Sequence, residues 1–206
     1  MANFFEIKIP VRKDEGWNEW AKEMRSKIKA AGIPVRWQMF HYHMTLLFLD
    51  DDNCIEDLNQ EFEQCMSVFY SIPITIDKLD AFTTGDGASH IIYLTSSQVP
   101  SQIFTLAEDA RTLADSLNAN YDKRPFKPHV TLGRVSADKV SLEQLQSVLH
   151  RINQPMFNCI LNEAEHRYFR GDKIKTWKLK YGYHLNNRIK LSGVSVSQYR
   201  GFLLCV

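Results

Sequence analysis

Two copies of one short pattern constrain the fold of this chain more than any other feature. The segments HYHMTLLFLD and KPHVTLGRV both contain His-x-Thr-Leu in an apolar, strand-like setting, with their histidines 86 positions apart. Side chains two positions apart on a strand point to the same side. His43 therefore shares one face with Thr45. In the second copy, His129 shares a face with Thr131. The repeat predicts two similar lobes, each contributing one strand to a shared cleft.

The same alternation assigns the residues between the polar positions to the opposite, core-facing side of each strand. In the first copy it places Met44, Leu46 and Phe48 in the core. In the second copy it directs Arg134 away from the face of His129. A role for Arg134 on a substrate phosphate and a role on the surface both stay open.

Helical and strand-like segments are mixed along the chain without strict alternation, which favours an α+β fold with antiparallel sheets. Helix-start patterns occur at Asn53 with Glu56 and at Ser141 with Gln144. Expected strands cover residues 3–10, 35–39, 43–49, 72–82, 90–95, 129–135, 157–169 and 174–184, and expected helices follow Trp17, Asn53, Ser101 and Ser141. We expect one domain over residues 1–185 and a strand-rich extension over 186–206.

The composition limits the classes of partner. The formal net charge is only +1 over 206 residues. A protein that binds long nucleic acid through many phosphates usually carries a basic excess. The four cysteines form no C-x-x-C pair, which argues against a zinc ribbon. The N-terminus lacks a signal-peptide core, and no apolar run approaches roughly 18 residues. We expect a cytoplasmic protein that engages at most a short nucleic-acid end and no membrane.

The residue types of the repeat indicate acid–base chemistry. Imidazole has an unperturbed pKa of about 6.5, so it can give or take a proton near neutral pH. Two imidazoles that face one reacting atom can act as acid and base in one step. Threonine hydroxyls beside them can hydrogen-bond phosphate oxygens. His43, Thr45, His129 and Thr131 therefore describe a site for opening a phosphodiester without a metal or another cofactor.

Several neighbours are candidate substrate contacts or ligands. Phe126 precedes the second motif and could stack on a base, and the nearby Arg124 and Lys127 could attract an anion. His41 and His43 are spaced i, i+2 and could share a metal, but the sequence offers no third ligand at a suitable spacing. We therefore expect no metal site.

The quoted segments also resemble a known group. FHYHMTLLFLD and FKPHVTLGRV look like the two signature motifs of the 2H phosphoesterase superfamily. Within it, the chain most resembles the RNA 2′,3′-cyclic phosphodiesterases, also called 2′-5′ RNA ligases. VRWQMFHYHMTLLFL and LDAFTTGDGASHIIYLT resemble further parts of that family, from about residue 3 to about residue 185. Asp50 and His90 depart from the family pattern, which leaves substrate preference open.

This resemblance implies a bilobal, pseudo-two-fold α+β fold with two antiparallel sheets lining a central cleft and helices outside. It implies that His43 is the proton donor to the leaving ribose oxygen and that His129 is the base for the attacking water. Thr45 and Thr131 would hold the phosphate oxygens, with a 2′-phosphomonoester as product. The residues alone do not decide which imidazole is acid and which is base.

Three functions stay open. The first is hydrolysis of RNA 2′,3′-cyclic phosphate ends or cyclic nucleotides by a monomer. The second is a related activity on 2′-5′ oligonucleotides, on an ADP-ribose cyclic phosphate, or in RNA ligation. The third is a binding module that holds a nucleotide or RNA end without turnover.

Overall fold

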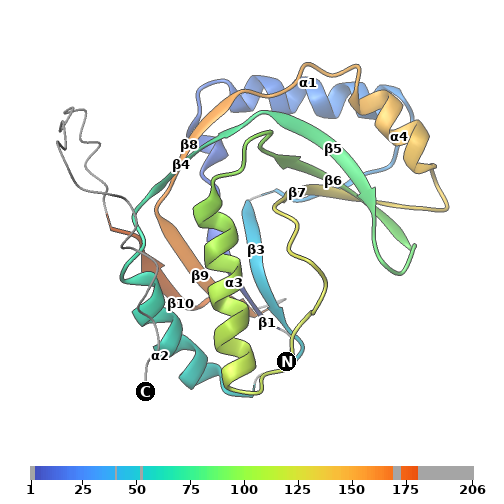
Figure 1. The fold of residues 1–206 in the computed structure, drawn as a ribbon. Helices are drawn as coiled ribbons and strands as arrows, with labels where there is room; N and C mark the ends of the chain where they lie inside the picture. Colours follow the sequence, from blue (N-terminus) through green and yellow to red (C-terminus); the bar gives the residue numbers. More distant parts are fainter. Residues whose placement is uncertain (1–2, 40, 52, 169–172, 181–206) are drawn as a thin grey trace, which may run out of the picture.

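The computed structural model describes residues 3–39, 41–51, 53–168 and 173–180. They form an α+β fold of two lobes, each built on a four-stranded antiparallel sheet, as predicted (Figure 1). The predicted extension over 186–206 lies outside these residues.

The first lobe contains one sheet flanked by two helices. Its motif strand is at one edge, next to the N-terminal strand. In sheet order, the strands are β10 (Lys173–Lys178), β9 (Glu163–Tyr168), β1 (Asn3–Lys8) and β3 (His43–Leu49), and the helices are α2 (Ile55–Met66) and α3 (Ser101–Ser116). In this lobe α2 packs on β10 and α3 packs on β3 (Figure 1).

The second lobe is also built from one four-stranded sheet and two helices. Its sheet runs in the order β2 (Arg36–Trp37), β7 (Val130–Ser136), β6 (Ser89–Thr95) and β5 (Lys78–Thr83), and its helices are α1 (Trp17–Ala30) and α4 (Leu142–Leu149). A short 3₁₀ turn, Val11–Lys13, precedes α1. The two motif strands β3 and β7 are in contact where the lobes meet.

Two predicted long strands are each divided into two shorter ones. The segment 72–82 breaks at Asp77 into β4 (Ile72–Ile76) and β5, and the segment 157–169 breaks at Asn162 into β8 (Phe157–Leu161) and β9. Strands β4 and β8 pair with each other in a separate two-stranded sheet. Each break therefore passes the chain from this small sheet into the sheet of one lobe.

Of the two predicted capping boxes, one forms in the structure and the other does not. Ser141 and Gln144 form the predicted capping box at α4, with Gln144 N donating to Ser141 Oγ over 3.2 Å. The predicted box at α2 is wrong. That helix starts after Cys54, whose φ of 60° places it in the left-handed region, and the cap has no side-chain hydrogen bond. Asn53 instead donates its backbone N–H to Asp51 Oδ1.

Both motif strands contain a bulge at the same point of the motif. Between β1 and β3, Phe5 faces Leu47 and Glu6 faces Thr45, which leaves Leu46 as the extra residue. A bulge adds one residue to one strand and so reverses the side on which later side chains lie. Beyond it, Phe48 lies on the face of His43 and is half-buried, so its predicted place in the core is wrong.

The second bulge has the same effect on β7. Ile92 faces Gly133 and Tyr93 faces Thr131, so Leu132 is the extra residue. Leu132 and Gly133 are both buried, and the next residue, Arg134, is exposed. The strict alternation that directed Arg134 away from His129 therefore does not hold.

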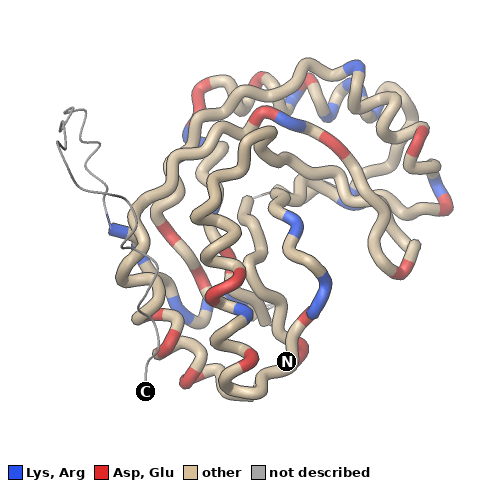
Figure 2. The backbone as a smooth tube through the Cα atoms, viewed as in Figure 1, with Lys and Arg blue, Asp and Glu red and all other residues tan. Residues whose placement is uncertain are grey.

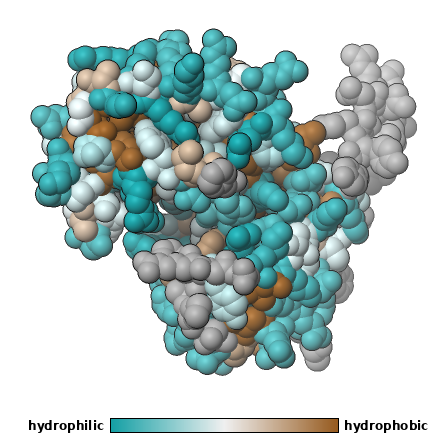
Figure 3. All heavy atoms as spheres, turned by 180° about the vertical axis from the view of Figure 1, so that it is seen from behind, coloured by the Kyte–Doolittle hydropathy of each residue, from teal (hydrophilic) through white to brown (hydrophobic). Residues whose placement is uncertain are grey.

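The surface outside the cleft gives little information about partners. In Figure 3, which shows the molecule from behind, hydrophilic residues cover most of the described surface and the apolar ones form small patches. None of the helices in the described ranges has both the length and the apolar character of a membrane span.

Candidate active site

A cleft of about 570 Å³ opens between the lobes, beside the two motif strands. Thr45 and Phe48 from β3 line one side, and His129, Thr131 and Arg134 from β7 and its approach line the other. The loop that leads into β7 closes one end, and Figure 2 shows its Lys and Arg positions in blue. The bulges explain why Phe48 and Arg134 reach this cleft.

His129 is held in one orientation by its own loop. Its Nδ1 lies 2.7 Å from the carbonyl oxygen of Lys127, which can only accept, so Nδ1 carries the proton and donates it. The ring packs edge-on against Phe82 and Tyr93, with centroids 5.2 and 5.9 Å away. Burial lowers the pKa of His129 below its usual value. A neutral ring in this orientation offers Nε2 as a proton acceptor.

His43 lies deeper, with a side chain 20% exposed. Its ring stacks on Phe4 with centroids 5.4 Å apart. Burial, together with the positive charges of His41, His129 and Arg167, lowers the pKa of His43 to about 3, and the backbone of His41 acts in the opposite direction. His43 begins β3 and His129 directly precedes β7, and these two strands are in contact where the lobes meet.

The two motif threonines occupy corresponding places. Thr45 and Thr131 are both half-buried, and both line the cleft. Neither hydroxyl has a hydrogen-bond partner in the described part of the chain, which leaves both available to a ligand oxygen. The structure thus brings His129, Thr45 and Thr131 to one cleft, with His43 at its side.

The other predicted contacts also lie at the cleft. Arg134 lines the same cleft as His129, and its charge is among the causes that lower the pKa of that ring. Phe126 is half-buried and packs edge-on against Phe104 of α3, so part of its ring already serves packing. Lys127 Nζ lies 4.2 Å from the centroid of Phe82, on the cleft wall.

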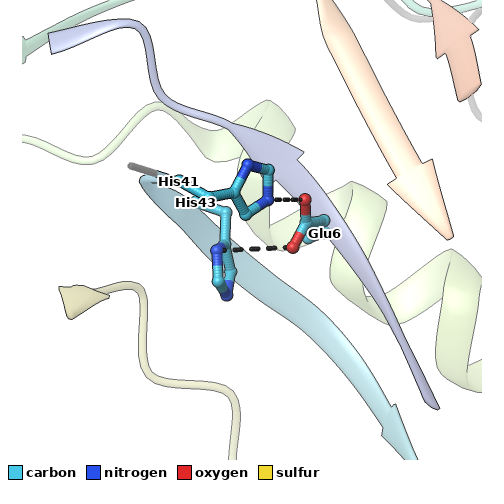
Figure 4. Close-up of side chains that lie close together, drawn as sticks. All are labelled: Glu6, His41 and His43. Atoms are coloured by element: carbon cyan, nitrogen blue, oxygen red, sulfur yellow. Dashed lines mark hydrogen bonds and ion pairs between the residues drawn. The ribbon is translucent and has the colours of Figure 1, made fainter. Parts of the chain in front are cut away.

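The sequence did not identify Glu6 as part of this site. Glu6 lies on β1 between His41 and His43, and its side chain is fully buried (Figure 4). Its Oε1 is hydrogen-bonded to His41 Nε2, and its Oε2 lies 3.3 Å from His43 Nδ1. One signal was present in the sequence, because Glu6 is the only charged side chain in the apolar run FFEI.

Glu6, His41 and His43 also supply donor atoms within 4.8 Å of one another. The carboxylate is the third group that the sequence-based metal hypothesis lacked. Transition metals bind such sets through free nitrogen lone pairs. Here both carboxylate oxygens already face imidazole nitrogens. We therefore describe the three side chains as a buried carboxylate that has a hydrogen bond to His41 and a close contact with His43.

Comparison with solved structures places this fold among known ones. Escherichia coli LigT in complex with 3′-AMP is 22% identical, with a TM-score of 0.59 over 86% of this chain and 97% of that one. Kluyveromyces marxianus Usb1 is 10% identical, with a TM-score of 0.60 over 86% and 98%. TT0787 of Thermus thermophilus is 15% identical, with a TM-score of 0.57 over 89% and 100%.

The sequence itself gives the family. No curated protein matches it significantly. The profile of the 2′-5′ RNA ligase superfamily matches residues 12–165, which include both His-x-Thr-Leu motifs and most of both lobes. This confirms the resemblance that the motifs indicated. The chain belongs to the 2′-5′ RNA ligase superfamily, one of the 2H phosphoesterases.

Proposed function

We propose that this phosphoesterase hydrolyses RNA 2′,3′-cyclic phosphate ends, or cyclic nucleotides, to 2′-phosphomonoesters. The observation that carries this proposal is the duplicated motif. It places His129 and the hydroxyls of Thr45 and Thr131, which have no hydrogen-bond partner among the described residues, in the lining of one cleft, and His43 on the same strand as Thr45. A cyclic phosphodiester needs one base, one acid and donors for its non-bridging oxygens, and this set supplies all three.

We assign the roles in this reaction as the family resemblance implies. His129 Nε2 accepts a proton from water, and the water oxygen forms a bond to phosphorus. The bond from phosphorus to the ribose O3′ breaks, and His43 Nε2–H gives its proton to that oxygen. The two rings exchange protons with solvent before the next turnover. Thr45 and Thr131 donate to the non-bridging oxygens, and Arg134 offers a guanidinium to the same charge.

The substrate class is a nucleotide or a short RNA end. A cleft of about 570 Å³ suits a ligand of small-molecule size. LigT has been solved with 3′-AMP, ATP and NADP+, which supports a nucleotide ligand here. Phe48, Phe82 and Phe126 line the cleft, and among them Phe48 and Phe126 are our candidates for stacking on a base.

The same cleft is compatible with two alternative functions. One is cleavage or joining of 2′-5′ linked oligonucleotides, which the superfamily name supports. The other is nucleotide binding without turnover. A binding module has no need of two imidazoles at the phosphate, and this observation favours an enzyme. A monomeric state and a cytoplasmic location stay predictions.

Product analysis tests the proposal. We would incubate the protein with 2′,3′-cyclic nucleotides and then with 2′-5′ linked oligonucleotides, and identify the remaining phosphate. We expect 2′-phosphate, a bell-shaped pH dependence and no effect of EDTA. His43→Ala and His129→Ala should each reduce the rate about 10²–10⁴-fold. Formation of 3′-phosphate alone, or a double variant with undiminished turnover, would contradict the proposed reaction.

A further inference from the structure

The buried Glu6 carboxylate lies directly behind the proposed acid. Glu6 is 0% exposed on β1, a strand that is buried over nearly its whole length. Burial raises the pKa of Glu6, and the negative charge of Glu165 on β9 adds to that rise. The hydrogen bond and charge of His41, together with the charge of Arg167, act in the opposite direction. A carboxylate in this place needs a partner for each oxygen.

One Glu6 oxygen has such a partner and the other faces His43. Figure 4 shows the carboxylate between the two rings, with Oε2 and His43 Nδ1 joined by a dashed line of 3.3 Å. Both atoms are buried, and neither has a well-aligned hydrogen bond within the described residues. A small rotation of the ring would turn this contact into a hydrogen bond from Nδ1–H to the carboxylate.

This contact breaks the symmetry between the two motif imidazoles. His129 has the carbonyl of Lys127, two residues earlier, as the partner of its Nδ1. His43 Nδ1 has no such hydrogen bond within the described residues, although the backbone of His41 acts on the pKa of His43 in favour of the charged ring. Of the two rings, His43 is the one whose Nδ1 faces a carboxylate. A carbonyl fixes the tautomer of a neutral ring, whereas a carboxylate also stabilises the charged ring.

The low pKa of His43 indicates why a carboxylate beside this ring would matter for catalysis. Burial lowers the pKa of His43 to about 3, so the free ring is neutral at pH 7. A proton donor at that position needs negative charge nearby in the working complex. A bound phosphodiester brings one such charge on the cleft side of the ring. Glu6 brings another on the opposite side.

We propose that Glu6 is a positioning residue that accepts a hydrogen bond from His43 Nδ1–H, aims Nε2 at the substrate and makes His43, rather than His129, the acid. This inference rests on the proposed function. In the step, Nε2–H is transferred to the ribose O3′, Nδ1–H stays on the ring, and Glu6 remains ionised. The carboxylate therefore changes the protonation of His43 without touching the substrate.

The pH dependence of turnover by Glu6→Gln tests this role. An opposite charge at this distance typically changes a pKa by 1–3 units. We expect the alkaline limb of the rate profile to move to lower pH by about that amount, with partial recovery in Glu6→Asp. The other charged groups facing His43 and Glu6 stay in place: His41, His129, Glu165 and Arg167. A uniform loss of rate with an unmoved limb would overturn the proposal.

A matched control removes a neighbouring carboxylate that does not touch His43. Glu165 is 1% exposed and faces Glu6 across the β1–β9 pair, and it forms ion pairs with Lys8, Arg167 and Lys173. Glu165→Gln should displace the alkaline limb less than Glu6→Gln does. Equal displacement would show that distant charge, and not the contact with Nδ1, determines the protonation of His43.

A second readout does not depend on turnover. NMR titration of His43 in the full chain, with saturating inorganic phosphate, should give a pKa at least one unit lower in Glu6→Gln than in the unsubstituted protein. If the protein makes no product but shows this difference, the contact stands and the proposed function fails. Equal pKa values would overturn the contact. If the difference depends on a metal that EDTA removes, the group is a metal site and the proposal is also overturned.

Discussion

At the scale of single residues, Arg134 and Phe48 show how the two copies of the motif have diverged. Each is the third residue after its motif threonine, and each reaches the cleft because of the bulge before it. One copy therefore contributes a cation and the other an aromatic ring. In the proposed reaction, Arg134 contacts the phosphate of the substrate and Phe48 stacks on its base.

Arg134 should contribute to substrate binding more than to the proton transfers. A guanidinium beside an anionic phosphate forms charge-assisted hydrogen bonds that are present before and during the reaction. We expect Arg134→Ala to raise the KM for 2′,3′-cyclic nucleotides about 10-fold, which corresponds to about 1.4 kcal/mol. Arg134→Lys should recover part of this loss. The measurement is steady-state kinetics at fixed ionic strength.

Arg151 supplies the matched control for this prediction. It is an exposed cation just after α4 and is not part of the cleft lining. Arg151→Ala removes the same charge from the protein and should leave KM unchanged. Equal effects of the two substitutions would assign the change to net charge and not to a phosphate contact.

At the scale of elements, the periodicity of the sequence predicts well where helices and strands lie, but predicts poorly to which sheet a strand belongs. The spacing of apolar residues gave the positions of α1, α3, α4 and β3 closely. The strand expected over 72–82 missed the change of sheet at Asp77, although the alternation shifts there: Ile72, Ile74 and Ile76 are buried before the break, and Leu79 and Ala81 after it. The spacing could not show the bulge in β3, because Leu46 and Leu47 are both apolar and both buried.

Gly133, which follows the extra residue of the β7 bulge, allows the segment 35–37 to approach β7 closely. A Cβ at Gly133 would lie 2.6 Å from Val35 Cγ1, 3.0 Å from Trp37 Cε3 and 3.1 Å from Arg36 O. Overpacking of this kind costs typically 1–3 kcal/mol. We expect Gly133→Ala to lower the free energy of unfolding by about that amount in urea titrations. Because β2 would be displaced from β7, the orientation of Arg134 should change as well.

Two further variants check the cause. Val35→Ala removes the closest contacting atom, so the double variant with Gly133→Ala should be more stable than the sum of the single effects predicts. Gly16→Ala is the control, since its added Cβ would meet only the flexible Asp14 carboxylate at 3.3 Å. Simple additivity in the double variant would exclude the contact with Val35 as the source of the cost.

At the scale of the whole molecule, the site depends on contacts between distant parts of the chain. The motif spacing predicted that two lobes share a cleft, because similar strands imply similar surroundings. The pairing of Glu6 with His41 and His43 could not be predicted, since it depends on which strand lies beside β3. Strand β1 also takes part in a second hydrogen-bonded group around a buried histidine, and that group is not part of the cleft lining.

That group joins three elements of the first lobe around His166, which is fully buried. Its Nε2 lies 2.6 Å from Asn3 Oδ1 on β1, and its Nδ1 lies 2.7 Å from Asn59 Oδ1 on α2. A neutral ring has a single N–H, and Asn3 Nδ2 already donates to the carbonyl oxygen of Asp51, so in the neutral state the Asn59 amide turns its NH2 group toward the ring. The ring also stacks on Phe5 with centroids 4.2 Å apart. Burial lowers the pKa of His166 to about 4, so the ring is neutral in the folded protein at pH 7.

His166 should therefore make the stability of the protein depend on pH. The pKa in the unfolded chain is about 6.5, so below that pH the unfolded state binds a proton that the folded state does not. The neutral His166 ring makes its full contribution to the free energy of unfolding above about pH 6.5. This contribution is lost as the pH falls toward about 4. Between pH 7.5 and pH 5 this group alone should remove about 2 kcal/mol from the free energy of unfolding.

Urea titrations at these two pH values, on the unsubstituted protein and on His166→Gln, isolate that contribution. The variant should be less stable at pH 7.5, because it loses the hydrogen bonds and the stacking on Phe5. It should lose less stability on acidification, because glutamine does not titrate. His150→Gln, at an exposed position at the end of α4, should keep the pH dependence of the unsubstituted protein. Equal pH dependence in all three proteins would mean that His166 is already protonated in the folded state, and that the amides of Asn3 and Asn59 both accept from it.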